Sequence, residues 1–317
     1  MISLSNIHLY KGGADRKIKT SLQIPAGSYF QLFAGLREVV FLDDVPASRV
    51  NNIILHAESL NLYAKALPFN FKLNDTEEKF LPASRSEESF TSIVISKDSE
   101  TSKRANFVFE QVMAEDVPEA IRKERCREAG SFLGYPDCCI NSFLTMAADF
   151  EGNTQAFHHI YNNTKGVCNL FLASPFRLTE HIPCSYSCEK SISIARQTLS
   201  LVENEKRSFG PFVDFFREID DLLCMSWSVW KFIAFVNPRK KEDVVEYDSF
   251  FIFEGPAKKS FLEMKRVADI AKKSNAFIIK NGTVEFFNSR GGRLETSGIA
   301  SAGSSAFAPG LFSWSRA

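Results

Sequence analysis

The chain has no net charge of either sign, because 38 basic residues balance 38 acidic residues over its 317 positions. Proteins that coat nucleic acid or an anionic membrane usually carry a large positive charge, so this balance argues against both as main partners. No run of about eighteen apolar residues is present, and a membrane-spanning helix requires one. The first residues, MISLSNIHLYKGGADRK, lack the charged and then apolar layout of a secretion signal. We therefore expect a cytoplasmic protein with no membrane span and no nucleic-acid partner.

Internal repeats with a period of 20–50 residues are also absent, which argues against a solenoid or an array. The chain is rich in phenylalanine, with 30 residues, and we expect most of these rings to fill the core. It contains seven cysteines. An odd number of clustered cysteines in a cytoplasmic chain is better explained by metal or redox chemistry than by disulfide bonds.

The N-terminal third alternates the patterns of strands and helices. Segments rich in β-branched and aromatic residues predict strands at 37–44, 69–73 and 91–97. Apolar residues recur at helical spacing over 47–67, and capping residues open a second predicted helix over 98–113. We assign residues 1–117 to a domain built on a small α/β sheet.

The middle of the chain, 118–228, reads as a helical layer that carries all seven cysteines. A helix is expected to end on Gly134, since glycine is a favoured helix stop. Further helices are expected to begin at Pro136 and Pro183, because proline is favoured in the first turn of a helix. A fourth helix is predicted within 211–227.

The C-terminal region, 229–296, has the pattern of antiparallel strands with one helix between them. Asn281-Gly282 between alternating apolar residues is a strong hairpin signal. The last residues, 297–317, are dominated by small side chains and are expected to form a flexible tail. The overall fold class is therefore α+β: an N-terminal α/β sheet, a central helical layer and a C-terminal antiparallel sheet.

Four of the cysteines lie in two short segments that each follow a proline, GYPDCC (134–139) and HIPCSYSC (181–188). In a helix that begins at Pro183, Cys184 and Cys188 are four residues apart, so both side chains project from one face. The unpaired N–H groups at a helix start favour negative charge. They therefore favour the thiolate, which is the form that binds metal.

Cys138 and Cys139 take the same place behind Pro136. Two helix starts with two cysteines each predict a centre in which four sulfurs bind a metal ion or cluster. An iron–sulfur cluster or iron is preferred over zinc, because the spacing matches no compact zinc module and a chain of this size needs no metal to fold. His181, three residues before Cys184, is expected to donate or accept a proton beside the centre.

Two other uses of these thiols stay open. In one, a structural zinc ion joins two helices so that the phenylalanine-rich sheet presents a surface to a partner protein. In the other, no metal binds, and the vicinal thiols exchange with the second pair as a dithiol redox enzyme.

Other residues give weaker signals. Cys126, Cys168 and Cys224 are expected in the core. His158 and His159 are weaker ligand candidates than the cysteines. The segment 289–298 has two arginines, Arg290 and Arg293, on either side of two adjacent glycines and is either a phosphate-binding turn or a flexible loop.

The two motifs, in EAGSFLGYPDCCINSF and HIPCSYSCEKSISIAR, resemble a group of uncharacterised prokaryotic proteins. Their shared pattern is Gly-Tyr-Pro-x-Cys-Cys followed by His-x-Pro-Cys-Ser-x-x-Cys-x-x-Ser, and the resemblance covers about residues 127–197. It implies no activity. It does imply that seven residues belong together: Tyr135, Cys138, Cys139, His181, Cys184, Cys188 and Ser191.

Together these patterns predict a redox or sulfur-transfer enzyme that acts on a small-molecule substrate. Cys138, Cys139, Cys184 and Cys188 are its predicted metal ligands. His181 and Tyr135 are its predicted catalytic residues.

Overall fold

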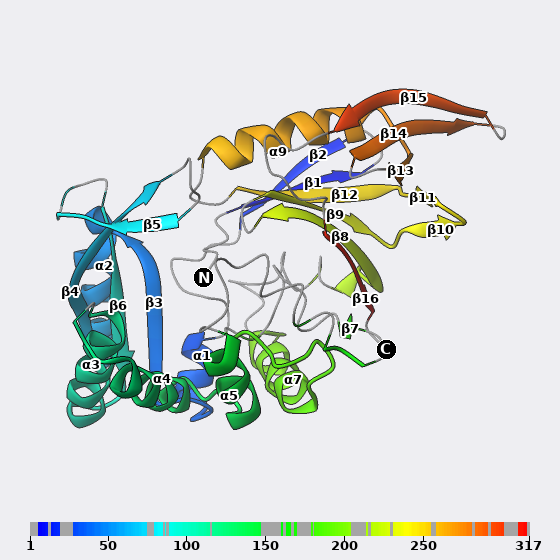
Figure 1. Cartoon of the computed structure of the whole chain (residues 1–317). Helices are drawn as coiled ribbons and strands as arrows, with labels where there is room; N and C mark the ends of the chain where they lie inside the picture. Colours follow the sequence, from blue (N-terminus) through cyan, green and yellow to red (C-terminus); the bar gives the residue numbers. More distant parts are fainter. Residues whose placement is uncertain are drawn as a thin grey trace.

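Figure 1 shows the computed structural model of the chain, in which three β-sheets are flanked by helices. The structure describes residues 6–11, 14–19, 28–74, 79–84, 86, 89–114, 116–146, 160, 163–165, 168–169, 179, 181–203, 214, 217–228, 231–254, 258–280, 283–290, 293–300 and 310–315. Within these ranges, every helix is too short or too polar to cross a membrane. Helices combined with mostly antiparallel sheets confirm the predicted α+β class.

A four-stranded antiparallel sheet stands at the left of Figure 1, in the order β3-β6-β4-β5. Its strands are β3 (Val39–Pro46), β4 (Tyr63–Asn74), β5 (Lys79–Pro82) and β6 (Phe90–Ser96). One face packs against α1 (Ser28–Phe33) and α2 (Val50–Ser59), and the other against α3 (Ser99–Met113) and α4 (Glu119–Phe132). Because helices cover both faces, six consecutive residues of β6, 91–96, are buried.

The local sequence explains where these helices begin and end. The Asp98 carboxylate accepts a hydrogen bond from the Thr101 N–H at 2.8 Å and caps α3, as the capping pattern predicts. The predicted helix over 47–67 is too long. A short 3-10 turn, Ala47–Arg49, precedes α2, and the helix ends at Ser59. Asn61 then adopts a φ of 57°, a left-handed conformation that stops the helix before β4.

The other two sheets lie at the upper right of Figure 1. The seven-stranded sheet has the order β2-β1-β12-β9-β8-β16-β7, and the five-stranded sheet has the order β10-β11-β13-β14-β15. The strands of the first are β1 (Asn6–Lys11), β2 (Ala14–Lys19), β7 (Cys168–Asn169), β8 (Asp221–Ser228), β9 (Lys231–Val236), β12 (Ser249–Glu254) and β16 (Gly310–Ser315). Those of the second are β10 (Arg239–Lys241), β11 (Val244–Glu246), β13 (Ala276–Lys280), β14 (Thr283–Arg290) and β15 (Arg293–Ala300).

One apolar core joins both sheets to α9 (Lys258–Ala271). Aromatic rings form its centre: the Phe235 ring lies 4.5 Å from the Phe277 ring and 4.7 Å from the Tyr247 ring, centroid to centroid. The predicted hairpin is confirmed by the pairing of Lys280 with Thr283, which leaves two residues for the turn. Phenylalanine therefore serves the core here, as its abundance indicates.

The N-terminal strands do not join the N-terminal sheet. β1 pairs with β12 over its whole length, from Asn6 opposite Glu254 to Lys11 opposite Ser249. The first two strands thus pair with the C-terminal strands, whereas the alternating pattern of the sequence groups them with the residues up to 117. The boundaries at 117, 228 and 296 stay predictions.

Two further predictions of secondary structure are wrong. A helix is predicted within 211–227, but residues 221–227 belong to strand β8, which lies between β9 and β16 because the short apolar run pairs on both sides. The predicted flexible tail also contains strands. Residues 293–300 pair with β14, and 310–315 pair with β8 and, in parallel, with β7.

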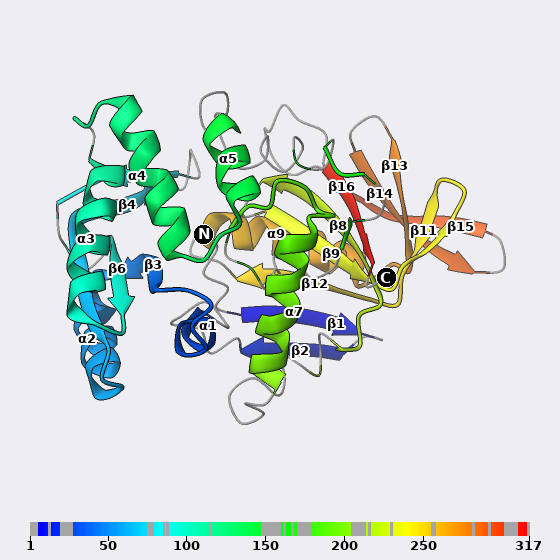
Figure 2. The same cartoon turned by 90° about the horizontal axis from the view of Figure 1, so that it is seen from below.

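The remaining helices, α5 (Asp137–Met146) and α7 (Glu189–Glu203), lie with α1 on the side of the seven-stranded sheet away from α9. Figure 2, seen from below, shows α5 and α7 as neighbours at this face. α1 contacts α7 through a hydrogen bond from the Gln31 side chain to Thr198. α5 carries Cys138 and Cys139, and Cys184 and Cys188 lie in the segment that precedes α7.

Candidate metal centre

The turn between α4 and α5 fixes the first cysteine pair. Gly134 adopts a φ of 68°, and a Cβ at this position would collide with the carbonyl oxygen of Leu36. Only glycine both adopts this positive φ without strain and leaves room for the Leu36 carbonyl oxygen. α5 then begins beyond Pro136, whose carbonyl oxygen accepts hydrogen bonds from Cys139 N–H at 2.8 Å and Ile140 N–H at 3.0 Å. Both cysteines therefore lie in the first turn of α5, as predicted.

α4 and α5 also approach each other closely. A Cβ on Gly130 would lie 2.8 Å from the Ile140 side chain, so this glycine allows the two helices to pack where a larger residue would separate them. The first turn of α5 is therefore held at its base by α4 and, through Gly134, by the segment that leads into β3.

The second cysteine pair lies in a turn and not in a helix that begins at Pro183. α7 begins at Glu189, and Cys188 directly precedes it, with its carbonyl oxygen accepting from Ile192 N–H at 2.9 Å. Cys188 N–H donates to the Ser185 carbonyl at 3.2 Å, which folds the segment back on itself. The prediction of a shared helix face for this pair is thus wrong. A turn brings the two residues together in its place.

The buried residue Tyr186 anchors this turn. Its side chain is 1% exposed, and its N–H donates to the Thr164 hydroxyl at 2.9 Å. The hydroxyl of Thr164 in turn donates to the Ile160 carbonyl at 2.8 Å. We infer that burial of Tyr186 stabilises a turn at this segment, so the helix begins at Glu189 and not at Pro183 as the proline indicates.

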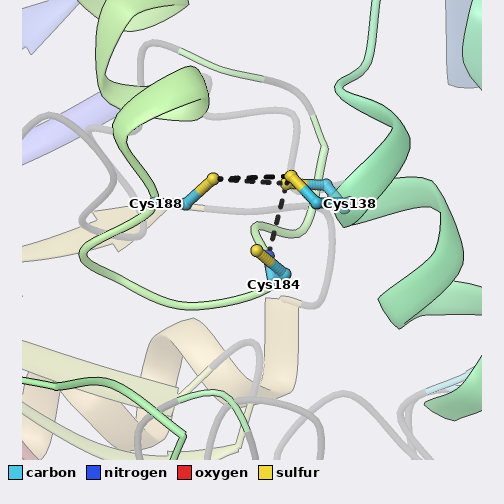
Figure 3. Close-up of side chains that lie close together, drawn as sticks. Cys138, Cys184 and Cys188 are labelled. Carbon is cyan, nitrogen blue, oxygen red and sulfur yellow. Dashed lines mark hydrogen bonds between the residues drawn. The ribbon is translucent and has the colours of Figure 1, made fainter.

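The four sulfurs meet. The Sγ atoms of Cys138, Cys139, Cys184 and Cys188 all lie within 4.8 Å of one another. Three pairs are closer still: Cys138 to Cys139 at 3.9 Å, Cys138 to Cys188 at 3.9 Å, and Cys139 to Cys188 at 3.8 Å. Figure 3 shows the side chains of Cys138, Cys184 and Cys188 pointing toward one another from α5 and from the turn before α7. The predicted convergence of the two motifs is confirmed.

The four thiols differ in their surroundings. Cys139 is 1% exposed and Cys188 9%, whereas Cys184 is half-buried and Cys138 is exposed. Cys139 Sγ accepts a hydrogen bond from the Cys184 N–H at 3.4 Å and lies 3.2 Å from Ser191 Oγ. The cluster is thus closed on the inside and open at Cys138.

The pKa values of the thiols diverge. Hydrogen bonds from the Cys139 thiol and from Ser191 lower the pKa of Cys188 well below its usual range, against the opposing effect of burial. The pKa of Cys139 is raised, first because its proton is donated to Cys188 and second because it is buried. Burial and the nearby Cys188 charge raise the pKa of Cys184 to about 11. These contacts therefore favour the thiolate form at Cys188 over Cys139 and Cys184.

A buried polar pair lies behind the cluster. His181 Nε2 and Ser191 Oγ are 2.7 Å apart, and both residues are buried, with exposed fractions of 5% and 0%. The Tyr135 ring packs against the His181 ring with centroids 5.0 Å apart. The Ser191 hydroxyl therefore connects the His181 imidazole to Cys139 Sγ through two polar contacts. The catalytic roles of His181 and Tyr135 stay predictions. Reasoning from residue types alone missed Ser191. Ser191 follows Cys188 by three residues in the first turn of α7, and this spacing is the signal in the sequence that could have identified it as a neighbour of the cysteines.

The other candidates lie apart from the cluster. Cys224 is buried in β8, where desolvation raises its pKa to about 12, and Cys126 is half-buried in α4. Arg290 and Arg293 are paired residues at the end of the β14–β15 hairpin. His158 and His159, and the side chain of Cys168, lie outside the described residues.

Comparison with known proteins supports the resemblance to an uncharacterised family. Neither the curated proteins nor the solved structures contain a match to this chain. A family model does match residues 94–209, a little over a third of the chain. These residues include both cysteine motifs and run from the end of β6 past the end of α7. In this segment the chain is similar to the family described as "Protein of unknown function (DUF483)".

Proposed function

We propose that Cys138, Cys139, Cys184 and Cys188 bind one metal ion and form the centre of a redox or sulfur-transfer enzyme. The proposal rests on the convergence of the four sulfurs. In a tetrahedral site with metal–sulfur bonds of about 2.3 Å, adjacent sulfurs lie about 3.8 Å apart. Three of the sulfur pairs here are separated by 3.8–3.9 Å, and all four atoms lie within 4.8 Å.

The surroundings of the sulfurs suit a thiolate centre. Four thiolates on a divalent ion carry a net charge of about −2, which requires compensation in a partly buried site. Cys138 and Cys139 lie in the first turn of α5, and Cys188 directly precedes α7, so the positive ends of two helix dipoles face the centre. The Cys184 N–H and the Ser191 hydroxyl lie within hydrogen-bonding distance of Cys139 Sγ, and such contacts stabilise a coordinated thiolate.

The spacing favours a single ion over an iron–sulfur cluster. In a four-iron cluster each thiolate binds a different iron, so the ligating sulfurs lie farther apart than four sulfurs on one ion. Iron and zinc both form tetrahedral sites with four thiolates. Iron gives a one-electron redox centre, whereas zinc activates a sulfur nucleophile.

An enzymatic role is supported by the open side of the cluster. Cys138 is exposed, so a small-molecule substrate in the cytoplasm has access to the centre from that side. The buried pair of His181 and Ser191 supplies a group that takes up or releases a proton next to Cys139.

A structural zinc site is the second candidate. The cluster joins α5 to the turn before α7, across about fifty residues of chain, and such a cross-link restrains the two helices. In this case the ion fixes the helices so that the phenylalanine-rich sheets present a surface to a partner.

Metal analysis of protein purified without oxygen tests the proposal. We expect one equivalent of iron or zinc, no acid-labile sulfide, and four sulfur neighbours at about 2.3 Å by X-ray absorption. Cys184→Ser should lose the metal, whereas the matched Cys126→Ser, outside the cluster, should keep it. Equal metal content in these two variants contradicts the assignment, and stoichiometric labile sulfide points to a cluster. Zinc whose removal leaves every activity unchanged favours the structural role.

A further inference from the structure

The four cysteines are not equivalent, and Cys138 stands apart in its exposure. Cys139 and Cys188 are buried and Cys184 is half-buried, but Cys138 is exposed on the first turn of α5. Three sulfurs therefore form an inner set, and the fourth lies where the cluster meets solvent.

Polar contacts surround the inner sulfur of Cys139. Cys139 Sγ lies 3.2 Å from the Ser191 hydroxyl, accepts from the Cys184 N–H and lies 3.8 Å from Cys188 Sγ. Within the described part of the chain, the polar contacts of Cys138 Sγ are with the other sulfurs, Cys139 and Cys188. In that part no backbone N–H or hydroxyl donates to Cys138 Sγ or to Cys184 Sγ, and Cys138 is the more exposed of these two residues. Cys138 is therefore the sulfur that leaves the centre most easily.

We propose that Cys138 is an exchangeable ligand and that the thiol of a small molecule replaces it. This inference rests on the proposed metal centre. In the exchange, the bond from the metal to Cys138 Sγ breaks and a bond to the incoming sulfur forms. The proton of the incoming thiol passes to Cys138 Sγ. No electron is transferred, and the charge of the centre is unchanged because one thiolate replaces another.

The charge and the softness of the site select a thiol over other ligands. The two helix starts and the hydrogen bonds to Cys139 compensate a centre of four thiolates, and replacement of Cys138 by neutral water changes that charge. A metal held by three thiolates also prefers a soft sulfur ligand to a carboxylate. A substrate thiol bound in this way is held as its thiolate, the form that attacks an acceptor in sulfur transfer.

Cobalt binding to matched variants tests the inference. Co²⁺ takes tetrahedral thiolate sites and has visible absorption, which Zn²⁺ lacks. The wild type, Cys138→Ala and Cys188→Ala are titrated with Co²⁺ and then with mercaptoethanol. We expect Cys138→Ala to keep cobalt with about three quarters of the thiolate-to-cobalt absorption, because three of four sulfurs remain. Mercaptoethanol should restore the missing absorption in a saturable manner. Cys188→Ala should bind cobalt at least tenfold more weakly and show no such restoration.

A second measurement uses the unaltered protein, so that the test does not depend on how a variant folds. Wild-type protein loaded with cobalt is incubated with or without mercaptoethanol and then treated briefly with iodoacetamide in large excess over the added thiol, which also consumes the reagent; the alkylated residues are identified by mass spectrometry. We expect mercaptoethanol to accelerate alkylation of Cys138 at least tenfold while the cobalt is retained. Cys126, half-buried outside the cluster, should be unaffected by the thiol.

The outcomes separate the two proposals. Wild-type protein that binds cobalt through four thiolates, but whose Cys138→Ala variant loses it or ignores mercaptoethanol, overturns the exchange and leaves the metal centre standing. Alkylation of Cys184 before Cys138, or metal loss that accompanies alkylation, also overturns the exchange. Wild-type protein that binds no cobalt, zinc or iron overturns both.

Discussion

Ser191→Ala removes one hydroxyl and tests whether the buried pair behind the cluster supports metal binding. Ser191 is fully buried, and its Oγ lies 2.7 Å from His181 Nε2 and 3.2 Å from Cys139 Sγ. The hydroxyl has one proton and two lone pairs, so it can join the imidazole to the sulfur. Alanine keeps the size of the side chain close to that of serine and removes both contacts.

The size of the effect follows from these contacts. Loss of a hydrogen bond at a buried polar group costs about 1–3 kcal/mol. Removal of a group that hydrogen-bonds a metal ligand lowers metal affinity about 10–100-fold, which corresponds to about 1.4–2.8 kcal/mol. The two ranges agree. We therefore expect the metal affinity of Ser191→Ala to fall about 10–100-fold, with the number of sulfur ligands unchanged.

Competition with a chromophoric chelator measures this affinity. The matched control is Ser193→Ala, on the same helix, whose Oγ is exposed and accepts from Gln197 Nε2 at 3.3 Å. The control should bind metal as the wild type does. Equal affinities for Ser191→Ala and Ser193→Ala would refute the reasoning, because the hydroxyl next to Cys139 then contributes nothing to the metal site.

Three further predictions concern the fold that positions the site. Gly134→Ala should destabilise the protein by about 1–3 kcal/mol more than Gly35→Ala in thermal unfolding. Both residues have a positive φ, but only at Gly134 would the added Cβ also collide with a backbone carbonyl oxygen. Equal losses of stability in the two variants would contradict this account. Deletion of residues 310–317 should lower the melting temperature strongly or give insoluble protein, since it removes β16 from between β8 and β7, and an unchanged melting temperature would show that the strand contributes little. Asp98→Ala should cost about 0.5–2 kcal/mol at neutral pH through loss of the α3 cap. Hydrogen bonds from Thr101 lower the pKa of Asp98, so the stability that it contributes is present above its unfolded-state pKa and is lost as the pH falls through the folded-state value; a difference between variant and wild type that stays constant down to pH 2 would refute this linkage.

The sequence predicted local elements well where one local signal dominates. The cap at Asp98, the glycine stop at Gly134 and the hairpin between Lys280 and Thr283 all follow from neighbouring residues, and each is confirmed. The pairing of β1 with β12 and the insertion of β16 beside β8 connect residues more than eighty positions apart. No local pattern records such a pairing, because any amphipathic strand matches several partners.

The convergence of the cysteines was predicted for a partly wrong reason. The proline before Cys184 indicates a helix start, but burial of Tyr186 favours a turn, and the helix begins only at Glu189. The turn brings the side chains of Cys184 and Cys188 together, as one face of a helix would. The spacing of the motif therefore predicted the cluster correctly, although the predicted helix that was meant to form it is absent from this segment. What the sequence did not indicate is the asymmetry of the cluster, since exposure depends on how α5 packs against the rest of the chain.

The location of the cluster bears on its role. Within the described part of the chain, three apolar clusters of strands and helices contain none of the four cysteines, although Cys139 and Cys188 are themselves buried. The sheets therefore have their own stabilising contacts, and the metal is not required to build them, in contrast to small domains that fold only around an ion. The cluster lies instead where α5 meets the start of α7, with one sulfur in contact with solvent. A metal bound there would join α5 to the turn before α7 outside these three clusters, and this position is the reason that we propose chemistry at the exposed sulfur ahead of structural support.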